Sequence, residues 1–139
     1  MCEIYSLDNI GEVAKRFLKV IDVRTLVALH GVMGAGKTTL VYNLCRVLGV
    51  RGNISSPTYS IIKEYEGEDQ RIIYHIDLYR IKDEYEAIQA GVEDCLNSGN
   101  LCFIEWPGLV INIMPSNYLK VEIAILNETT RQLTWKVHA

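Results

Sequence analysis

A glycine-rich segment, GVMGAGKT at residues 31–38, sets the strongest limit on the fold of this chain. Its spacing, G-x-x-x-x-G-K-T, is typical of loops whose backbone N–H groups hold phosphate oxygens. Such a loop needs a strand before it and a helix after it. Residues 25–30, TLVALH, predict a buried strand, and residues 37–48 predict a helix. The apolar face expected for that helix consists of Leu40, Leu44, Val47 and Leu48.

The residue types of the loop suit a nucleotide. The glycines at 31, 34 and 36 allow tight turns and a close approach of the backbone to a ligand. Lys37 is placed to contact the β- and γ-phosphates, and Thr38 is placed to ligate Mg²⁺. The residues that we expect to contact the nucleotide here are Met33, Gly34, Ala35, Gly36, Lys37, Thr38 and Thr39.

Two acidic residues follow apolar strands beyond the loop: Asp77 after RIIYHI and Glu105 after LCFI. Ligands of open α/β sheets bind beyond the carboxyl ends of the strands, where Mg²⁺ needs a carboxylate and a water needs orienting. We therefore expect both acids to be catalytic residues and metal ligands, without deciding which of them holds Mg²⁺ directly. A strand-end acid can equally be a solvated loop residue. This alternative weakens for Glu105, since an unpaired carboxylate between an apolar run and Trp106 would be expensive to bury.

Three further residues have two interpretations each. Thr58, within NISSPTYS at 53–60, is either a switch-loop residue that senses the γ-phosphate or part of an ordinary polar connection. Trp106 is either a core aromatic residue or a neighbour of the bound nucleotide. Arg80 stabilises charge on the γ-phosphate or, as is more common for such an arginine, pairs with a surface acid.

The remaining elements complete one α/β domain over residues 1–139. We expect an amphipathic helix over residues 6–21, capped by Ser6 or Asp8. A β-hairpin follows over residues 58–79, and then two short helices split at Gly91. A strand at 101–106 and an antiparallel hairpin near the end complete the set. The predicted fold is thus a single P-loop NTPase domain with a mixed central sheet, flanking helices and a C-terminal antiparallel hairpin.

The composition excludes several classes of protein. A net charge of −3 does not predict a broadly basic surface that binds a polyanion such as nucleic acid. The four cysteines contain no C-x-x-C pair and do not cluster with the histidines, so a zinc site is not expected. The first residues carry no Lys or Arg, and no apolar run approaches the roughly 20 residues of a membrane span. We expect a cytoplasmic protein without membrane contact.

Four segments together resemble a known family. GVMGAGKTTL, SSPTYSIIKEYEG, IYHIDLYRI and EAIQAGVEDCLNSGNLCFIEWP occur in the order and at the separations of the TsaE (YjeE-type) ATPases. The resemblance covers about Ser6 to Pro107, and H-x-D-L-Y-R with I-E-W-P is far more specific than the loop alone. Gly108 stands where the family often has an acid, and Ile81 replaces a frequent leucine.

The resemblance implies an ATPase that uses ATP and Mg²⁺ and serves threonylcarbamoyl modification of adenosine 37 in tRNAs that read ANN codons. It implies TsaB and TsaD as partners, with tRNA reached only through their complex; we expect the free chain to be a monomer. Hydrolysis is expected to be weak alone and gated by the partners. Lys37 and Thr38 match the phosphate and Mg²⁺ residues, and Thr58 the switch threonine. Asp77 and Glu105 match the acids required for Mg²⁺ binding and hydrolysis, and Trp106 matches a tryptophan near the nucleotide.

Three alternative functions fit the sequence less well. A small-molecule P-loop kinase usually brings lid arginines to the phosphoryl group, whereas the basic residues after Lys82 are only Lys120, Arg131 and Lys136, on the expected hairpin. A GTPase switch lacks its N-K-x-D base-reading motif here. A nucleotide-binding module without catalysis would keep its background rate after loss of Asp77 and Glu105. Residues 83–119 lack Lys and Arg, which suits a solvated face or a docking surface for a basic partner, and argues against tRNA there.

Overall fold

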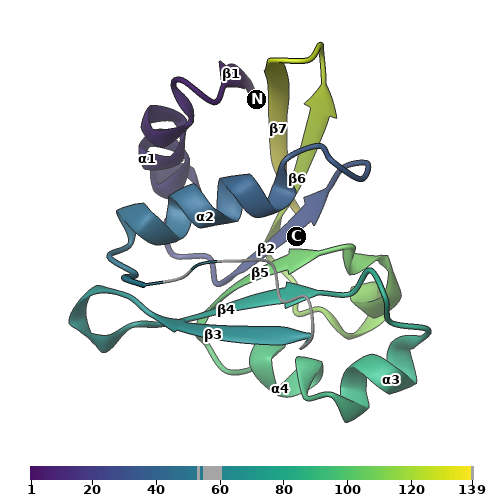
Figure 1. Cartoon of the computed structure of the whole chain (residues 1–139). Coiled ribbons are helices and arrows are strands. Elements are labelled where there is room, and N and C mark those ends of the chain that lie inside the picture. Colours follow the sequence, from purple (N-terminus) through teal and green to yellow (C-terminus); the bar gives the residue numbers. More distant parts are fainter. Residues whose placement is uncertain (53, 55–60, 139) are drawn as a thin grey trace.

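The computed structural model describes residues 1–52, 54 and 61–138. Within these residues, seven strands form one sheet in the order β1-β7-β6-β2-β5-β4-β3 (Figure 1). The strands are β1 (Cys2–Ser6), β2 (Leu26–His30), β3 (Ile62–Glu66), β4 (Ile72–Asp77), β5 (Leu101–Glu105), β6 (Tyr118–Ile125) and β7 (Thr130–His138). The helices are α1 (Ile10–Ile21), α2 (Lys37–Val47), α3 (Glu84–Gln89) and α4 (Val92–Leu96), with 3₁₀ turns η1 (Glu68–Gln70) and η2 (Pro107–Ile113).

The centre of the sheet is parallel and its margins are antiparallel. β2 lies between β5 and β6 and runs parallel to both, and β4 runs parallel to β5. β3, β7 and β1 are added in antiparallel pairs. Because β2, β4 and β5 run the same way, their carboxyl ends at His30, Asp77 and Glu105 meet at one edge. The predicted mixed sheet of a P-loop NTPase domain is confirmed.

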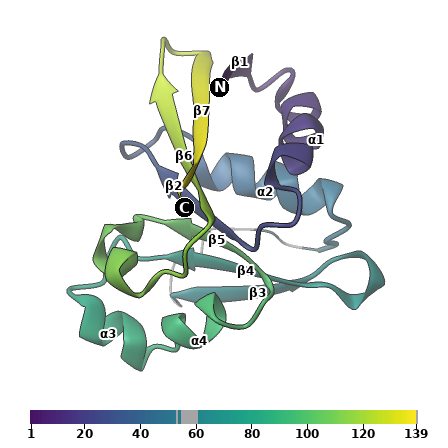
Figure 2. The ribbon, with the colours of Figure 1, turned by 180° about the vertical axis from the view of Figure 1, so that it is seen from behind.

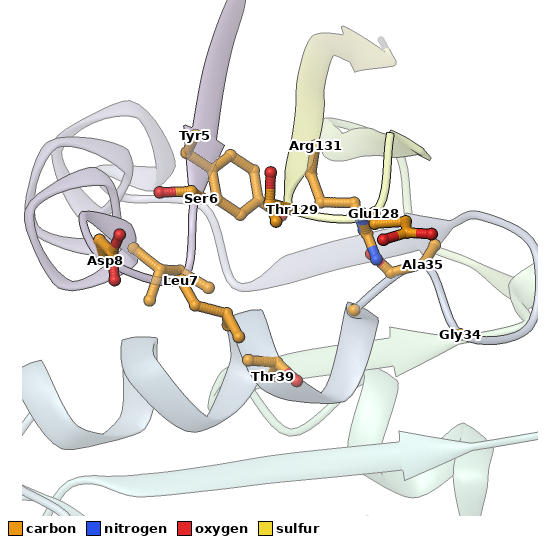
Figure 3. A pocket seen from close by; sticks show the side chains of 12 residues that line it. Tyr5, Ser6, Leu7, Asp8, Gly34, Ala35, Thr39, Glu128, Thr129 and Arg131 are labelled. Carbon is orange, nitrogen blue, oxygen red and sulfur yellow. The ribbon is translucent and has the colours of Figure 1, made fainter. Parts of the chain in front are cut away.

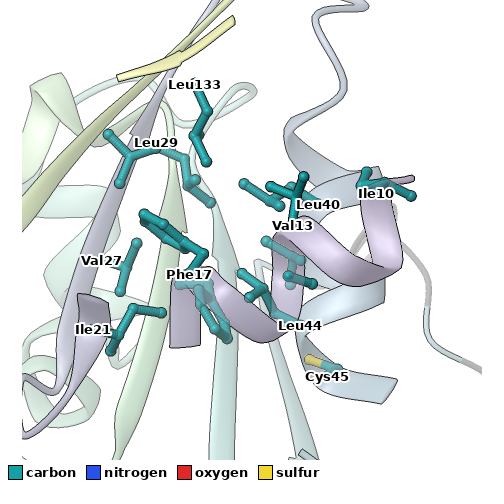
Figure 4. Packing of buried hydrophobic residues seen from close by; sticks show 14 of the residues in the cluster. Ile10, Val13, Phe17, Ile21, Val27, Leu29, Leu40, Leu44, Cys45 and Leu133 are labelled. Carbon is teal, nitrogen blue, oxygen red and sulfur yellow. The ribbon is translucent and has the colours of Figure 1, made fainter. Parts of the chain in front are cut away.

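The two faces of the sheet are covered differently. α1 and α2 lie across one face (Figure 1), where side chains of both helices pack against β2 and β5 around Phe17 and Leu44 (Figure 4). The turned view shows α3 and α4 over the other face, beside β3, β4 and β5 (Figure 2). We call these the α2 face and the α4 face. None of the helices in the described ranges has both the length and the apolar character of a membrane span.

Most predicted elements are confirmed. The β3–β4 and β6–β7 hairpins are antiparallel, and α3 and α4 are separated at Gly91, whose φ of 96° suits glycine. Asp83 caps α3 by accepting a hydrogen bond from the Glu86 backbone N–H at 2.9 Å. α2 ends before Gly49, as expected.

Three details differ from expectation. β1 was not predicted, because only Tyr5 within it is buried and its partner, β7, lies at the far end of the chain. Neither Ser6 nor Asp8 caps α1: Asn9 holds the N-cap position and its Oδ1 accepts instead from the Ser6 backbone N–H at 2.8 Å, which closes the turn out of β1. Val47 is exposed, because the buried stripe of α2 runs through Leu40, Val41, Leu44 and Cys45.

Candidate nucleotide site

The loop between β2 and α2 has the backbone conformation that its sequence predicts. Gly36 holds the N-cap position of α2 with φ of 101°, and a Cβ there would meet nothing within 4 Å. The left-handed backbone, rather than crowding by protein, therefore demands glycine, and space is left above the loop. At Gly31 the reason differs: a Cβ would lie 2.9 Å from the Ile123 carbonyl oxygen, so the close passage of β6 requires glycine. The first N–H groups of α2 have no intrahelical partner and suit an anion.

Lys37 lies inside the loop rather than on the surface. Its residue is 5% exposed, and Nζ donates to the Gly31 carbonyl at 2.5 Å. Nζ also lies 3.7 Å from the centroid of the Trp106 ring. Burial lowers the pKa of Lys37, and the charges of Glu105 and Asp77 oppose that shift. The loop therefore holds a cation whose nearest partners are a neutral carbonyl and a ring, which suits the capture of phosphate.

Glu105 links the loop to the neighbouring strands. It ends β5, beside β2, and is only 3% exposed. The Thr38 hydroxyl donates to its Oε2 at 2.8 Å. The His75 ring, fully buried on β4, places Nε2 2.5 Å from the same oxygen. The predicted metal ligands Thr38 and Glu105 are thus in direct contact.

Asp77 and Trp106 complete the wall of this site. Asp77 is opposite Glu105 in the β4–β5 register, and its Oδ1 accepts from the Tyr79 backbone N–H at 3.0 Å. The Trp106 ring lies 5.2 Å from the Tyr79 ring, centroid to centroid. A cavity of about 290 Å³ brings together nearly all of the residues predicted from the sequence: Met33, Gly34, Ala35, Gly36, Lys37, Thr38, Thr39, Asp77, Glu105 and Trp106, with Tyr79 in addition. Thr58 lies outside the described residues, and Arg80 is exposed and does not line the cavity.

A second cavity, of about 380 Å³, adjoins the other side of the loop (Figure 3). Leu7 and Asp8 approach it from the turn before α1, Thr39 from α2, and Glu128 from the β6–β7 turn (Figure 3). The Arg131 Nε donates to the Ala35 carbonyl at 3.0 Å, so β7 holds the loop from this side. No local signal in the sequence predicts this cavity, because its walls come from segments about 120 residues apart.

His75, which contacts Glu105, is a neighbour of the site that the sequence analysis missed. A signal was present: residues 73, 75 and 77 alternate along β4 and therefore share one face, which ends at the predicted acid Asp77. Within the described residues no group of three or more His, Cys, Asp or Glu can hold a metal ion.

The residues present fit Mg²⁺ together with a nucleotide. Mg²⁺ prefers oxygen ligands and is commonly bound by one or two carboxylates together with substrate phosphates. The Thr38 hydroxyl and the Glu105 and Asp77 carboxylates supply such oxygens on the cavity wall. Lys37 and the N-terminus of α2 supply the positive groups that phosphates need.

The sheet order, the strand–loop–helix unit and the acids beyond the parallel strands define the fold class of P-loop NTPase domains. Comparison with known proteins gives the family. The model described as "Threonylcarbamoyl adenosine biosynthesis protein TsaE" matches residues 4–133, and the chain belongs to the TsaE family.

Two curated relatives illustrate the similarity. The tRNA threonylcarbamoyladenosine biosynthesis protein TsaE of Haemophilus influenzae is 40% identical over 114 residues, which are 78% of this chain and 72% of the relative. The protein of the same name from Bacillus subtilis is 33% identical over 126 residues, covering 91% of this chain and 76% of the relative. The crystal structure of Bacillus subtilis YdiB has the same fold, with a TM-score of 0.73 at 24% identity, over 100% of this chain and 87% of that one.

Proposed function

We propose that this chain is a Mg²⁺-dependent ATPase that binds the TsaB–TsaD pair and supports threonylcarbamoylation of adenosine 37 in ANN-decoding tRNAs. The pathway is inferred from membership of the TsaE family. The observation that carries the ATPase proposal is the hydrogen bond from Thr38 Oγ1 to Glu105 Oε2 at the mouth of the loop. It joins the loop residue that ligates Mg²⁺ in P-loop proteins to a strand-end carboxylate.

The loop backbone, Lys37 and Thr38, and the two acids of the cavity each have a role in this proposal. The loop N–H groups and Lys37 bind the phosphates, and Thr38 and Glu105 hold the metal. Bound Mg²⁺ would neutralise charge on the β- and γ-phosphates. Asp77 accepts a hydrogen bond from the attacking water or from the shell of the metal. The nucleoside extends into the second cavity, which shares Gly34, Ala35, Gly36 and Thr39 with the first.

The site also supports weak hydrolysis by the chain alone. Among the described residues, no arginine lines the phosphate cavity. The Arg131 guanidinium donates to the carbonyls of Ala35, Asn127 and Thr130, which occupies it on the far side of the loop. An arginine supplied in trans accelerates phosphoryl transfer by roughly 10³–10⁵-fold. We therefore propose that the partners complete the site.

The test is ATP hydrolysis by the purified chain, alone and with its TsaB–TsaD pair, with Glu105→Ala as the control. We expect stimulation by the pair that is lost in the variant, and we expect tRNA threonylcarbamoylation to follow the same pattern. Hydrolysis that neither the pair nor Glu105 affects would refute the proposal. Transfer of the γ-phosphoryl group to a small molecule, with hydrolysis suppressed, would establish the kinase alternative instead.

A further inference from the structure

We propose that His75 is a positioning residue that fixes the Glu105 carboxylate for Mg²⁺ and nucleotide, an inference that rests on the proposed function. His75 does not line the phosphate cavity. It acts through Glu105, from the neighbouring strand, on the oxygen that Thr38 also contacts.

Packing alone does not account for a histidine at this position. The side chain is fully buried on the α2 face, between Ile73 and Asp77 along β4 and opposite Phe103 in the register with β5. Its Nδ1 is buried and has no hydrogen-bond partner among the residues that the structure describes. A buried polar atom without a partner lowers the stability of the folded state, because it has lost its hydrogen bonds to water. An apolar side chain would avoid that cost, so the bond made by Nε2 is the feature that requires the imidazole.

The hydrogen bonds determine the orientation of the carboxylate. A carboxylate only accepts when it is ionised, so Nε2 is the donor in this pair. Both donors, Nε2 of His75 and Oγ1 of Thr38, use Oε2. No hydrogen bond to Oε1 is found in the described part of the chain, which leaves Oε1 as the oxygen available to a cation or its water.

The size of the effect expected from losing such a hydrogen-bond donor to a metal ligand is known from other metal sites. Groups that hydrogen-bond to metal ligands orient them, and their loss typically lowers metal affinity or activity by about 10–100-fold. The preformed contacts also mean that Glu105 does not have to be ordered at the moment of binding. We therefore expect loss of the Nε2 donor to lower the affinity of the site for Mg²⁺. Binding of phosphate by the loop itself should stay unchanged.

The first experiment compares His75→Met with His75→Gln. Glutamine keeps an N–H donor near the place of Nε2, and methionine has similar length without a donor. ADP binding is measured by calorimetry in EDTA and across a Mg²⁺ series. For His75→Met we expect unchanged binding in EDTA and a requirement for about 10–100-fold more Mg²⁺, most of which His75→Gln restores. Unaltered Mg²⁺ dependence in His75→Met, or equal loss of binding in EDTA, would overturn the proposal.

A matched control separates this effect from general destabilisation of β4. Ile76→Val lies on the same strand but faces the α4 side, where Ile76 is fully buried. It is expected to lower stability by roughly the cost of one methyl group and to leave the Mg²⁺ dependence unchanged. A change in Mg²⁺ dependence as large as that of His75→Met would show that strand stability, not the donor, is responsible.

A second measurement needs no His75 variant and no bound nucleotide. Long-range ¹⁵N–¹H spectra of the free protein should show a hydrogen on Nε2 of His75, and Glu105→Ala should shift that signal. Absence of a hydrogen on Nε2 would overturn the proposal even if every His75 variant failed to fold. Failure of the proposed function is distinguishable, because the wild-type chain would then show no Mg²⁺-dependent nucleotide binding, whatever the state of this ring.

Discussion

The alternate residues of β4 and β5 point to opposite faces of the sheet, and the two faces differ in chemistry. On the α2 face, each strand changes from apolar to polar as it nears the phosphate loop: Ile73, His75 and Asp77 on β4, and Leu101, Phe103 and Glu105 on β5. On the α4 face the alternate residues Ile76, Cys102 and Ile104 are buried and apolar, and Tyr74 is half-buried. Buried side chains lie on both faces, so burial alone does not mark the site.

The difference shows how a strand combines packing with chemistry. Successive side chains point to opposite faces, and the carboxyl end of a parallel strand lies beside the ligand. A polar residue is therefore useful on only one face and only near one end. The predictions below test this difference between the faces, and they are given in order of decreasing size.

The largest effect is expected on the α4 face, but on stability alone. Leu96 on α4 is 3% exposed, and Leu96→Ala removes buried methyl groups and leaves a cavity. We expect a loss of about 2–5 kcal/mol in the free energy of unfolding, measured by urea titration. Nucleotide affinity of the folded protein should stay within about threefold of wild type. A selective loss of affinity would show that this face also shapes the site.

Glu105→Ala is the opposite case, with chemistry lost from the α2 face. We expect partner-stimulated ATP turnover to fall on the order of 10²-fold or more, because the carboxylate that contacts Thr38 is gone. Binding of ADP in EDTA should fall much less. Asp77→Ala provides the comparison at the neighbouring strand end. Unchanged turnover in both variants would refute the site assignment.

Lys37 predicts a pH dependence of smaller size. The ammonium attracts phosphate only while it is protonated, and burial lowers its pKa from the ordinary 10.5. ADP affinity should therefore be full below the lowered pKa and decline as pH rises through it, earlier than for an exposed lysine. Lys37→Ala should bind roughly 10–150-fold more weakly and lack this decline. Calorimetry at several pH values checks both, and an equal decline in the variant would assign the effect to another group.

The smallest effect concerns the reactivity of the cysteine thiols. It tests whether the buried residues on both faces of the sheet are protected from solvent. Cys2 is exposed, whereas Cys45, Cys95 and Cys102 are buried. Burial raises the pKa of Cys45, in the α2-face cluster, and of Cys102, in the α4-face cluster, to about 12. An aromatic disulfide reagent at pH 8 should react rapidly with one thiol and with the other three only on unfolding. Rapid reaction of Cys45 would show that the α2 face opens readily.

Sequence reasoning succeeded where a signal is local. The loop at 31–38, the hairpins and the break at Gly91 each depend on residues close together in the chain. The acids at 77 and 105 were found because apolar strands lead directly to them. It failed where partners are distant. β1 has little hydrophobic pattern, and its pairing with β7 spans most of the sequence.

Contacts around the candidate site that join distant segments could not be predicted from the sequence either. Neither the parallel pairing of β6 with β2 nor the bond from Arg131 to the loop can be read from a window of residues. The contact between His75 and Glu105 depends on the pairing of β4 with β5, which sequence periodicity does not provide. The sequence thus predicts which residues can bind or react, but it does not predict which residues from distant strands lie beside them.

The position of β2 between β5 and β6 also has a consequence for synthesis on the ribosome. The phosphate-loop sequence emerges early, but the strand that passes beside Gly31 and the arginine that holds Ala35 are translated some 90 residues later. Until β6 and β7 emerge, β2 has an unpaired edge and the loop lacks its support, so a nascent chain carries the complete motif before it has the site. Contacts this distant in sequence form slowly and leave strand edges open meanwhile. A growing chain halted after β5 should therefore depend on chaperones and should not yet retain nucleotide.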